Sequence, residues 1–157
     1  MFREAPIEGV AATPLDVRAD GRGWLAELFR SDELEPEHHP VMAYVSQTLP
    51  GKSRGPHEHR QQTDFFVFVG AGSFRLYLWD AREDSATYRN HQKLVVGETN
   101  RVRVLVPPGV VHAYKNIGDV PALVVNCPNR LYAGPGRQEE VDEIRYEGRK
   151  DSPYVFD

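Results

Sequence analysis

No stretch of this chain carries the long three-to-four-residue apolar spacing of an amphipathic helix. Its apolar segments are short, and Gly- and Pro-containing segments separate them: GRGW, LPGKSRGP, GAG, VPPG and AGPG. Short apolar runs bounded by such turn signals are typical of strands. The 157-residue chain has the length of one domain, and no linker or internal repeat divides it. We therefore expect a single all-β domain, a barrel or sandwich of about eight to ten strands such as a jelly roll.

The strongest strand signal lies between residues 65 and 80. Residues 65–69 read FFVFV, residues 73–80 read SFRLYLWD, and a Gly-Ala-Gly segment joins them. Bulky β-favouring residues on both sides of a glycine-rich turn predict a hairpin here. From Arg137 onward the chain is charged and has few apolar residues, so we expect a short helix or an extended tail that lies over another subunit. Further strands are expected at residues 42–49, 94–96, 102–106 and 121–127 and around His112.

Composition excludes several classes of protein. The net charge is −4, and the sequence shows no concentrated basic patch, which argues against a nucleic-acid partner. The single cysteine, Cys127, allows no internal disulfide and no thiolate cluster for zinc. The N-terminal segment MFREAPIEG lacks the apolar core of a signal peptide, and no run approaches the roughly 18 apolar residues of a membrane span. We expect a soluble, cytoplasmic protein with no membrane partner.

Three histidines stand out as candidate functional residues. His57 and His59 flank one glutamate in GKSRGPHEHRQQTD, and His112 follows a second Pro-Gly turn in VPPGVVHAYKN. On a strand, a spacing of two directs both side chains to the same face. Imidazole exchanges protons near neutral pH and also binds metals, so the residues alone leave both chemistries open. The neighbouring pair His38 and His39 is expected to lie on the surface.

The order of these residues resembles the two sequence motifs of the cupin superfamily, G-x5-H-x-H with a following acid and P-x-G-x2-H-x3-N. The second motif lacks the glycine that usually opens it, because Arg101 occupies that position. The resemblance implies a cupin-type double-stranded β-helix, or jelly-roll barrel, over residues 1–157, with an N-terminal strand segment and a charged C-terminal tail. The matching residues are Gly51, His57, His59 and Asp64 for the first motif and Pro107, Gly109, His112 and Asn116 for the second.

Among cupins, the chain is most similar to the dTDP-4-dehydrorhamnose 3,5-epimerase family and to the related sugar-nucleotide ketoisomerases. The similar blocks occur in the family's order: IEGV, DGRGWLAELFR, RGPH, LWDAR, PPGVVHAY and the region of Tyr132. The resemblance implies an isomerase that acts on a dTDP-linked 4-keto-6-deoxy sugar, needs no cofactor and forms a homodimer. Such an enzyme removes a proton from a carbon next to the ketone and returns a proton to it.

The resemblance also implies roles for individual residues. His57 would be the general base and Tyr132 the acid, with His59 assisting. Arg54 would bind phosphate, and Glu27 would contact the nucleotide. The further substrate-binding residues are expected to be Arg22, His112 and Gln47.

Three positions depart from the epimerase pattern. The family's active-site lysine has no counterpart, because the aligned region reads TDFFVF. His59 stands where epimerases have glutamine, a feature shared with ketoisomerases and metal cupins. The family's aspartate that pairs with the base lies in a C-terminal segment that does not align to EIRYEGRKDSPYVFD.

These departures leave three alternatives open. The first is a dTDP-sugar 3,4-ketoisomerase. The second is a metal-dependent oxygenase or isomerase, since histidines and a carboxylate suit a divalent transition metal such as iron, manganese, nickel or zinc. The third, suggested by the missing lysine, is a non-catalytic sugar-nucleotide binding protein. The candidate metal ligands are His57, His59, Asp64 and His112.

Overall fold

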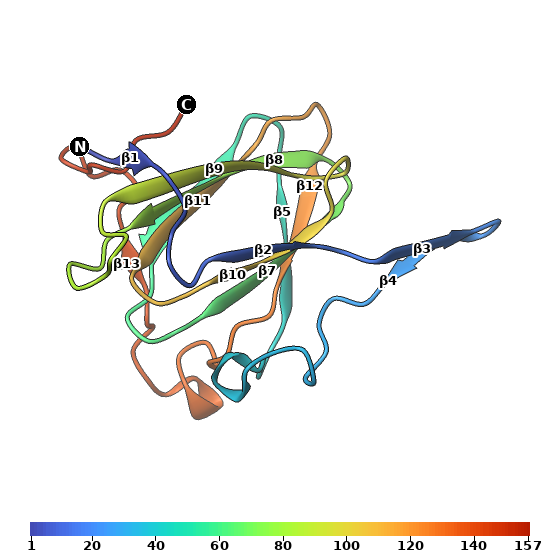
Figure 1. Ribbon diagram of the computed structural model, residues 1–157, viewed down its shortest axis with the longest axis horizontal. Coiled ribbons are helices and arrows are strands. Elements are labelled where there is room, and N and C mark those ends of the chain that lie inside the picture. The colour runs from blue at the N-terminus through green and yellow to red at the C-terminus, as the bar shows by residue number, and fades with distance from the viewer.

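A computed structural model describes residues 1–157 as two facing β-sheets with one hairpin outside them (Figure 1). The first sheet has the order β1 (Arg3–Glu4), β9 (Asn90–Gly97), β8 (Ser73–Asp80), β11 (Val110–Asn116), β6 (Ser53–Glu58) and β13 (Ile144–Arg145). The second has the order β2 (Ala11–Pro14), β10 (Val102–Val106), β7 (Asp64–Gly70), β12 (Ala122–Asn126) and β5 (Tyr44–Thr48). Two short 3-10 helices, η1 (Pro36–His38) and η2 (Pro135–Arg137), complete the structure. The all-β prediction is confirmed.

The main core lies between the two sheets. Phe66 and Phe68 of β7 face Phe74 of β8, and the Phe68 and Phe74 rings pack edge to face with centroids 5.6 Å apart. Alternate residues of each strand point inward, as expected for two sheets packed face to face. Tyr114 of β11 contacts the same aromatic group, and the Phe66 ring meets the His112 ring edge to face with centroids 5.2 Å apart. The core therefore holds β11 and β6, which carry His112 and His57, against a rigid aromatic layer.

The predicted hairpin at residues 65–80 is wrong, although both of its strands form. β7 pairs with β10 and β12, whereas β8 pairs with β9 and β11 in the other sheet. Ala71 has φ 52° and Gly72 has φ 89°, so the joining segment turns the chain from one sheet into the other. Both strands are almost wholly buried, and an apolar pattern of this kind fits either a hairpin or a crossing between sheets.

The C-terminal tail lies over its own sheet, contrary to our expectation of a tail directed to another subunit. β13 pairs antiparallel with β6, and Tyr154 and Phe156 pack on Trp79 of β8. The Tyr77 hydroxyl donates a hydrogen bond to the Asp157 carboxylate at 2.9 Å. The tail therefore has apolar anchors. They are far apart in a mostly charged segment, so the sequence did not predict that the tail packs on the sheet.

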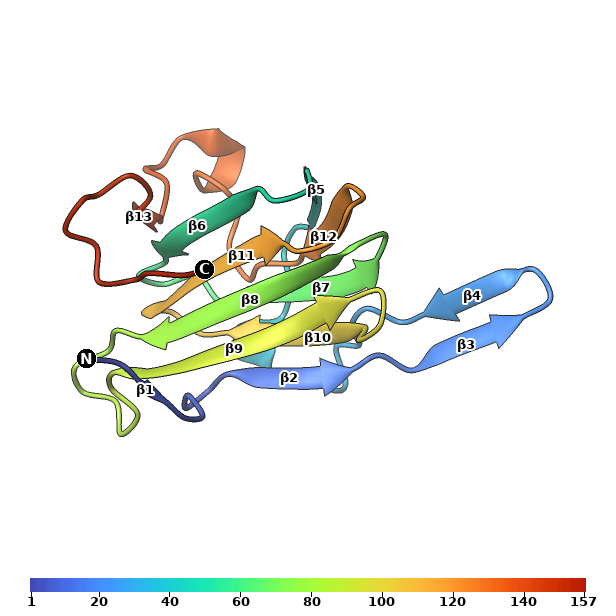
Figure 2. The ribbon, with the colours of Figure 1, turned by 90° about the horizontal axis from the view of Figure 1, so that it is seen from above.

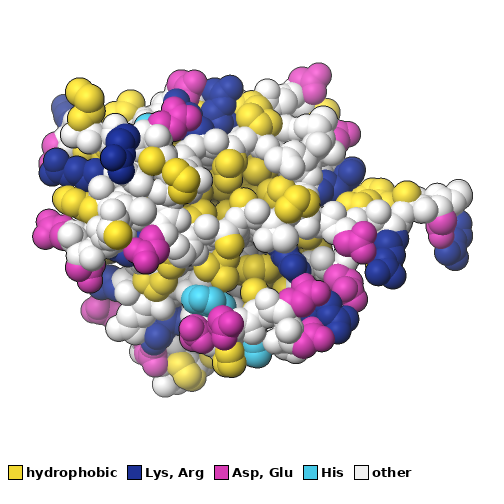
Figure 3. Space-filling model, viewed as in Figure 1, with side chains coloured by type: hydrophobic (Ala, Val, Ile, Leu, Met, Phe, Trp, Pro, Cys, Tyr) yellow, Lys and Arg dark blue, Asp and Glu magenta, His cyan; other side chains and the backbone are white.

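The hairpin of β3 (Val17–Asp20) and β4 (Gly23–Ala26) projects away from both sheets, as Figures 1 and 2 show. Trp24 and Leu25 on β4 are 48% and 63% exposed, and the Arg101 guanidinium lies over the Trp24 ring. Figure 3 shows apolar side chains on the hairpin close to where it leaves the two sheets. No helix of the structure has the length and apolar character needed to cross a membrane.

Candidate active site

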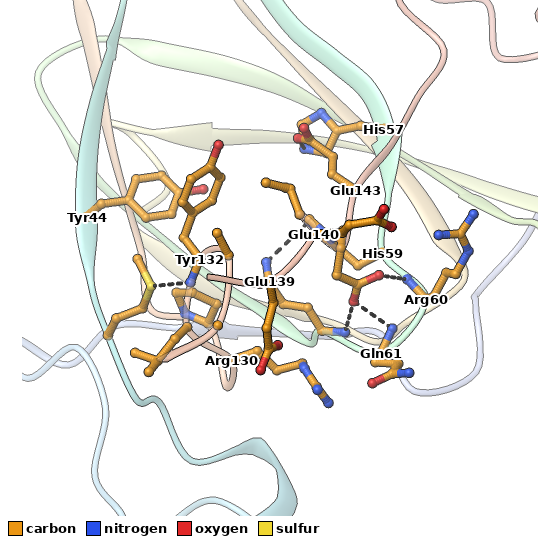
Figure 4. Close-up of a pocket in the computed structure, with 18 of the residues that line it drawn as sticks. Tyr44, His57, His59, Arg60, Gln61, Arg130, Tyr132, Glu139, Glu140 and Glu143 are labelled. Carbon is orange, nitrogen blue, oxygen red and sulfur yellow. Dashed lines mark hydrogen bonds and ion pairs between the residues drawn. The ribbon is translucent and has the colours of Figure 1, made fainter. Parts of the chain in front are cut away.

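A cleft of about 1150 Å³ opens beside β6 and β5. The loop after β6 and the segment from Pro128 to Glu147 form its remaining walls. Figure 4 shows Tyr44 and Tyr132 on one side and His57 with Glu143 on the other. Of the residues that the sequence singled out, His57, His59, Arg54 and Tyr132 all line this cleft.

The three histidines meet because β6 and β11 are neighbours. His57 lies opposite His112 in the strand register, and their ring centroids are 4.4 Å apart. His59 follows the last residue of β6, and its ring centroid is 5.9 Å from each of the other two. Gly55 permits this close pairing, since a methyl group there would lie 2.5 Å from the His112 carbonyl oxygen. The glycine of the RGPH block thus sets the distance between the two strands.

Asp64 of β7 lies behind the histidines and is fully buried. Its Oδ2 lies 3.2 Å from His59 Nε2 and 3.2 Å from His112 Nε2, and its Oδ1 accepts a hydrogen bond from the Asn126 amide at 2.8 Å. Burial alone would raise the pKa of Asp64, but His112 and His59 outweigh it and hold that pKa well below its usual value. Asp64 is therefore a buried carboxylate anion shared by two imidazoles.

His59 is held between two oxygen acceptors. Its Nδ1 meets the Asp142 carbonyl oxygen, and its Nε2 meets the Asp64 carboxylate. Burial opposes the charged form, but the hydrogen bond and charge of Asp64 prevail and raise the pKa of His59 to about 9. His59 is therefore an imidazolium at neutral pH when its nitrogens have only these partners, and it has no lone pair with which to accept a proton.

His57 has the opposite character. Burial lowers its pKa to about 2, and the neighbouring His112 acts in the same direction, while Asp64 opposes both. Its side chain is only 15% exposed, and its Nε2 and Nδ1 lie 4.0 Å from Glu143 Oε1 and 3.9 Å from Glu147 Oε1. His57 is therefore a neutral imidazole, open to the cleft, with two carboxylates placed to stabilise it once it gains a proton.

The C-terminal segment supplies these carboxylates. Glu143, Arg145 and Glu147 alternate into the cleft, whereas Tyr146 turns away and donates a hydrogen bond to Glu58. The Asp142 carboxylate accepts hydrogen bonds from three consecutive backbone N–H groups, those of residues 60–62, each at 2.9 Å. The sequence analysis missed this wall. The period-two spacing of charges at positions 143, 145 and 147 was its only signal.

Two tyrosines form the opposite wall. Tyr132 follows β12 in an irregular link, and its ring is 56% exposed and directed into the cleft (Figure 4). Tyr44 of β5 lies beside it, and its hydroxyl accepts a hydrogen bond from the Asn126 amide at 3.0 Å. Burial raises the pKa of Tyr44 to about 12, so it stays protonated. Sequence reasoning missed Tyr44, which is one aromatic residue in an ordinary alternating strand.

A sequence model of the dTDP-4-dehydrorhamnose 3,5-epimerase family matches residues 4–143. The chain belongs to this family. It is 41% identical over 140 residues to the probable low-salt glycan biosynthesis epimerase of Haloferax volcanii, covering 88% of this chain and 86% of the relative. It is 35% identical over 134 residues to the spore coat polysaccharide biosynthesis protein SpsL of Bacillus subtilis, covering 85% of this chain and 87% of the relative.

Solved structures of the family share this fold. The dTDP sugar isomerase of Desulfovibrio desulfuricans superposes with a TM-score of 0.75 at 28% identity, over 88% of this chain and 84% of that one. The dTDP-4-dehydrorhamnose 3,5-epimerase of Sulfolobus tokodaii superposes with a TM-score of 0.73 at 21% identity, over 90% and 79%. The predictions of a cupin-type jelly roll and of a family isomerase are confirmed.

Four other residues that the sequence predicted for the site do not line the cleft. Glu27 and Arg22 belong to the projecting hairpin and its exit, where each forms an ion pair with a nearby residue. Gln47 does not line the cleft, but its carbonyl oxygen accepts a hydrogen bond from Arg54 Nη2 at 2.9 Å. His112 is fully buried behind His57.

His38 and His39 are partly exposed, and their rings also make contacts within the fold. Both side chains are half-buried. His39 Nε2 lies 3.0 Å from the Ser31 carbonyl oxygen and 3.1 Å from that of Leu34. The ring therefore ties together the loop around η1, a role that a polar segment does not reveal in sequence.

Three of the four predicted metal ligands, the histidines, form a compact donor set that fits a divalent transition metal. The nitrogens of His57, His59 and His112 lie within 4.8 Å of one another. His112 Nδ1 is 3.1 Å from the Val110 carbonyl oxygen, which fixes the ring, and its buried Nε2 lies 3.2 Å from Asp64 Oδ2. An imidazole oriented through Nδ1 by a backbone carbonyl is a common arrangement in metal sites.

Proposed function

We propose that this protein epimerises a dTDP-linked 4-keto-6-deoxy sugar at a carbon next to the ketone. One observation carries the proposal: His57 is a neutral, nearly buried imidazole on the cleft wall, with Glu143 and Glu147 about 4 Å from its two nitrogens. Family membership supports the reaction type. The two tyrosines on the facing wall support a proton donor on the opposite face of a bound sugar.

In this mechanism His57 removes the proton from the carbon next to the ketone. The C–H electron pair forms the carbon–carbon double bond of an enolate, and the carbonyl pair moves onto oxygen. The proton on His57 is stabilised by Glu143 and Glu147, whose charges offset the burial that otherwise disfavours imidazolium. Tyr132 then returns a proton from the opposite wall, which inverts the carbon.

His59 assists without exchanging a proton in this scheme. It links Asp64, at the base of the site, to the Asp142 carbonyl oxygen of the C-terminal segment. Because Glu143 follows Asp142 directly, His59 helps to hold Glu143 next to His57.

Arg54 is proposed to bind the diphosphate. Its Nε and Nη2 donate to Thr48 Oγ1 and the Gln47 carbonyl oxygen, which fixes the guanidinium at the cleft wall. Its Nη1 has no protein partner and is free to meet an anion.

We further propose a homodimer in which the β3–β4 hairpin reaches a second copy of the chain. Neither Glu27 nor Arg22 lines the cleft of its own chain, and the β3–β4 hairpin projects away from both sheets (Figure 2). The exposed Trp24 and Leu25 offer apolar area for a partner. Light scattering should give twice the 17.8 kDa chain mass, and a monomer at micromolar concentration would rule this arrangement out. The cytoplasmic location stays a prediction from the sequence.

The reaction is tested by incubating the protein with dTDP-4-keto-6-deoxyglucose in deuterated water. Loss of the proton signal at carbon 3, at carbon 5 or at both in the NMR spectrum, with an epimerised product, is expected. A 3-keto product would identify a ketoisomerase instead. Tight dTDP binding with no exchange would identify a binding protein.

A second candidate function rests on the cluster of three histidines, whose ring nitrogens lie within 4.8 Å of one another. His57, His59, His112 and Asp64 would hold a divalent transition metal. Such an ion would supply Lewis-acid stabilisation of a developing oxyanion. Elemental analysis after purification without added metal tests this: about one ion per chain, lost in a His112→Gln variant, supports it, and a metal-free protein with full exchange activity excludes it.

A further inference from the structure

β13 places a charged side chain next to the proposed base. In the register of the sheet, β6 lies between β11 and β13, and His57 pairs with His112 on one side and Arg145 on the other. Side chains directly opposite each other in an antiparallel pair lie on the same face, with Cβ atoms about 5 Å apart. His112, His57 and Arg145 therefore form one row across three strands, and Arg145 is the member at the cleft mouth.

The contacts of Arg145 fix one end of its guanidinium and leave the other end free. Its Nε donates a hydrogen bond to Glu143 Oε2, and neither terminal nitrogen has a protein partner. The side chain is 69% exposed, whereas that of Glu143 is 17% exposed. Glu143 thus holds the guanidinium at the cleft wall, and its two NH₂ groups remain available to a ligand in the cleft.

The charge of Arg145 reaches both sides of the reaction centre. The hydrogen bond and charge of Glu143 raise the pKa of Arg145, and Tyr132 contributes in the same direction. Arg145 also adds to the effect of burial in lowering the pKa of His57. No lysine lines the cleft, and apart from the imidazolium of His59 its cationic side chains are all arginines: Arg54, Arg60, Arg130, Arg137 and Arg145.

We propose that Arg145 is a further catalytic residue, whose terminal nitrogens bind the keto oxygen of the sugar and stabilise the enolate. The inference rests on the proposed function. When His57 takes the proton from carbon, negative charge develops on the keto oxygen, and a guanidinium already fixed there stabilises it without rearrangement. Arg54, by contrast, lies three residues away on β6 and serves the diphosphate.

The test compares Arg145→Ala and Arg145→Lys with a matched control, Arg149→Ala. Arg149 belongs to the same tail, lies over the Tyr146 ring and does not line the cleft. The rate of deuterium incorporation into the sugar measures chemistry, and calorimetric titration with dTDP measures nucleotide binding. Circular dichroism melting checks that each variant keeps its fold.

Arg145→Ala should lower the exchange rate at saturating substrate by about 100-fold, the usual effect of removing one oxyanion donor. Its Kd for dTDP should change by less than about twofold, since the substitution leaves the contacts of the protein with the nucleotide unchanged. Millimolar guanidinium should restore part of the rate, Arg145→Lys should retain an intermediate rate, and Arg149→Ala should match the wild type.

Three results would overturn the inference. One is exchange at the wild-type rate in Arg145→Ala. Another is a dTDP Kd weakened about tenfold or more with the exchange rate unchanged, which would make Arg145 a phosphate ligand. The third is a lost rate that guanidinium does not restore, which would indicate a structural role for Arg145 alone. Absence of exchange in the wild type itself is distinct from these, and would remove the proposed function together with this inference.

Discussion

His57 and His59 are two residues apart and lie in the same site, yet their pKa values shift in opposite directions, to about 2 and about 9. Burial disfavours the charged form of both rings. His59 overcomes burial because both of its nitrogens meet oxygen acceptors, whereas the nearest carboxylates of His57 are about 4 Å away. The residues alone suggested an equivalent pair, and the family resemblance made His57 the base and His59 the assisting residue. The partners of each ring in space give the physical difference between them.

At the same scale, Tyr132→Phe should separate proton removal from inversion. Without the phenol, His57 can still remove the proton and return a deuteron to the same face, so deuterium enters the substrate. The epimerised product should fall by about 100-fold, in line with the loss of a general acid. NMR of the sugar in deuterated water measures both quantities. Equal loss of exchange and inversion would assign Tyr132 a different role, and Tyr44→Phe then becomes the variant to compare.

Among the secondary-structure elements, most strands were predictable from sequence, whereas their partners were not. The turn signals located β7, β8, β10 and β12 well. The hairpin prediction failed because Gly70 to Gly72 carries the chain between sheets, and local apolar pattern does not encode which strand lies alongside. For the same reason, the sequence did not predict β13. Its two-residue pairing with β6 depends on tyrosine and phenylalanine anchors far along the tail.

The close approach of β6 and β11 gives a prediction for Gly55→Ala. A methyl group there would lie 2.5 Å from the His112 carbonyl oxygen, and Gly55 also has φ 82°. Gly51→Ala is the matched control, since Gly51 has φ 71° but open space around it. The control should cost about 1 kcal/mol for its backbone conformation. Gly55→Ala should cost about 1–3 kcal/mol more, because the strands must separate. Urea unfolding measures both, and equal costs would contradict the close-approach argument.

For the whole molecule, the two sheets and the folded-back tail bring the cleft walls together from β5, β6 and the last third of the chain. Asp80 stabilises the far end of this assembly. Burial alone would raise its pKa, but hydrogen bonds from Arg82, Thr87 and Ser85 lower that pKa to about 2. A carboxyl whose pKa is depressed by folding stabilises the protein above its unfolded-state pKa of about 3.9, and this stabilisation is lost as pH falls through the folded-state value.

Asp80→Asn should therefore be less stable than the wild type by about 2 kcal/mol at pH 7, and the difference should shrink as pH falls from about 4 toward 2. Asp16→Asn, at an exposed carboxylate, is the control and should change the unfolding free energy by less than about 0.5 kcal/mol. Urea unfolding at several pH values provides the measurement. If the difference in unfolding free energy stays constant with pH, the charge of Asp80 does not account for the stabilisation.

The central claim is that one neutral imidazole on the cleft wall performs the proton transfer. Its most direct test is the rate of deuterium incorporation next to the ketone of a dTDP-4-keto-6-deoxy sugar, in the wild type and in His57→Asn. The account predicts rapid incorporation by the wild type and a rate about 1000-fold lower in His57→Asn, with dTDP binding retained. Incorporation at the wild-type rate in a folded His57→Asn variant would contradict it.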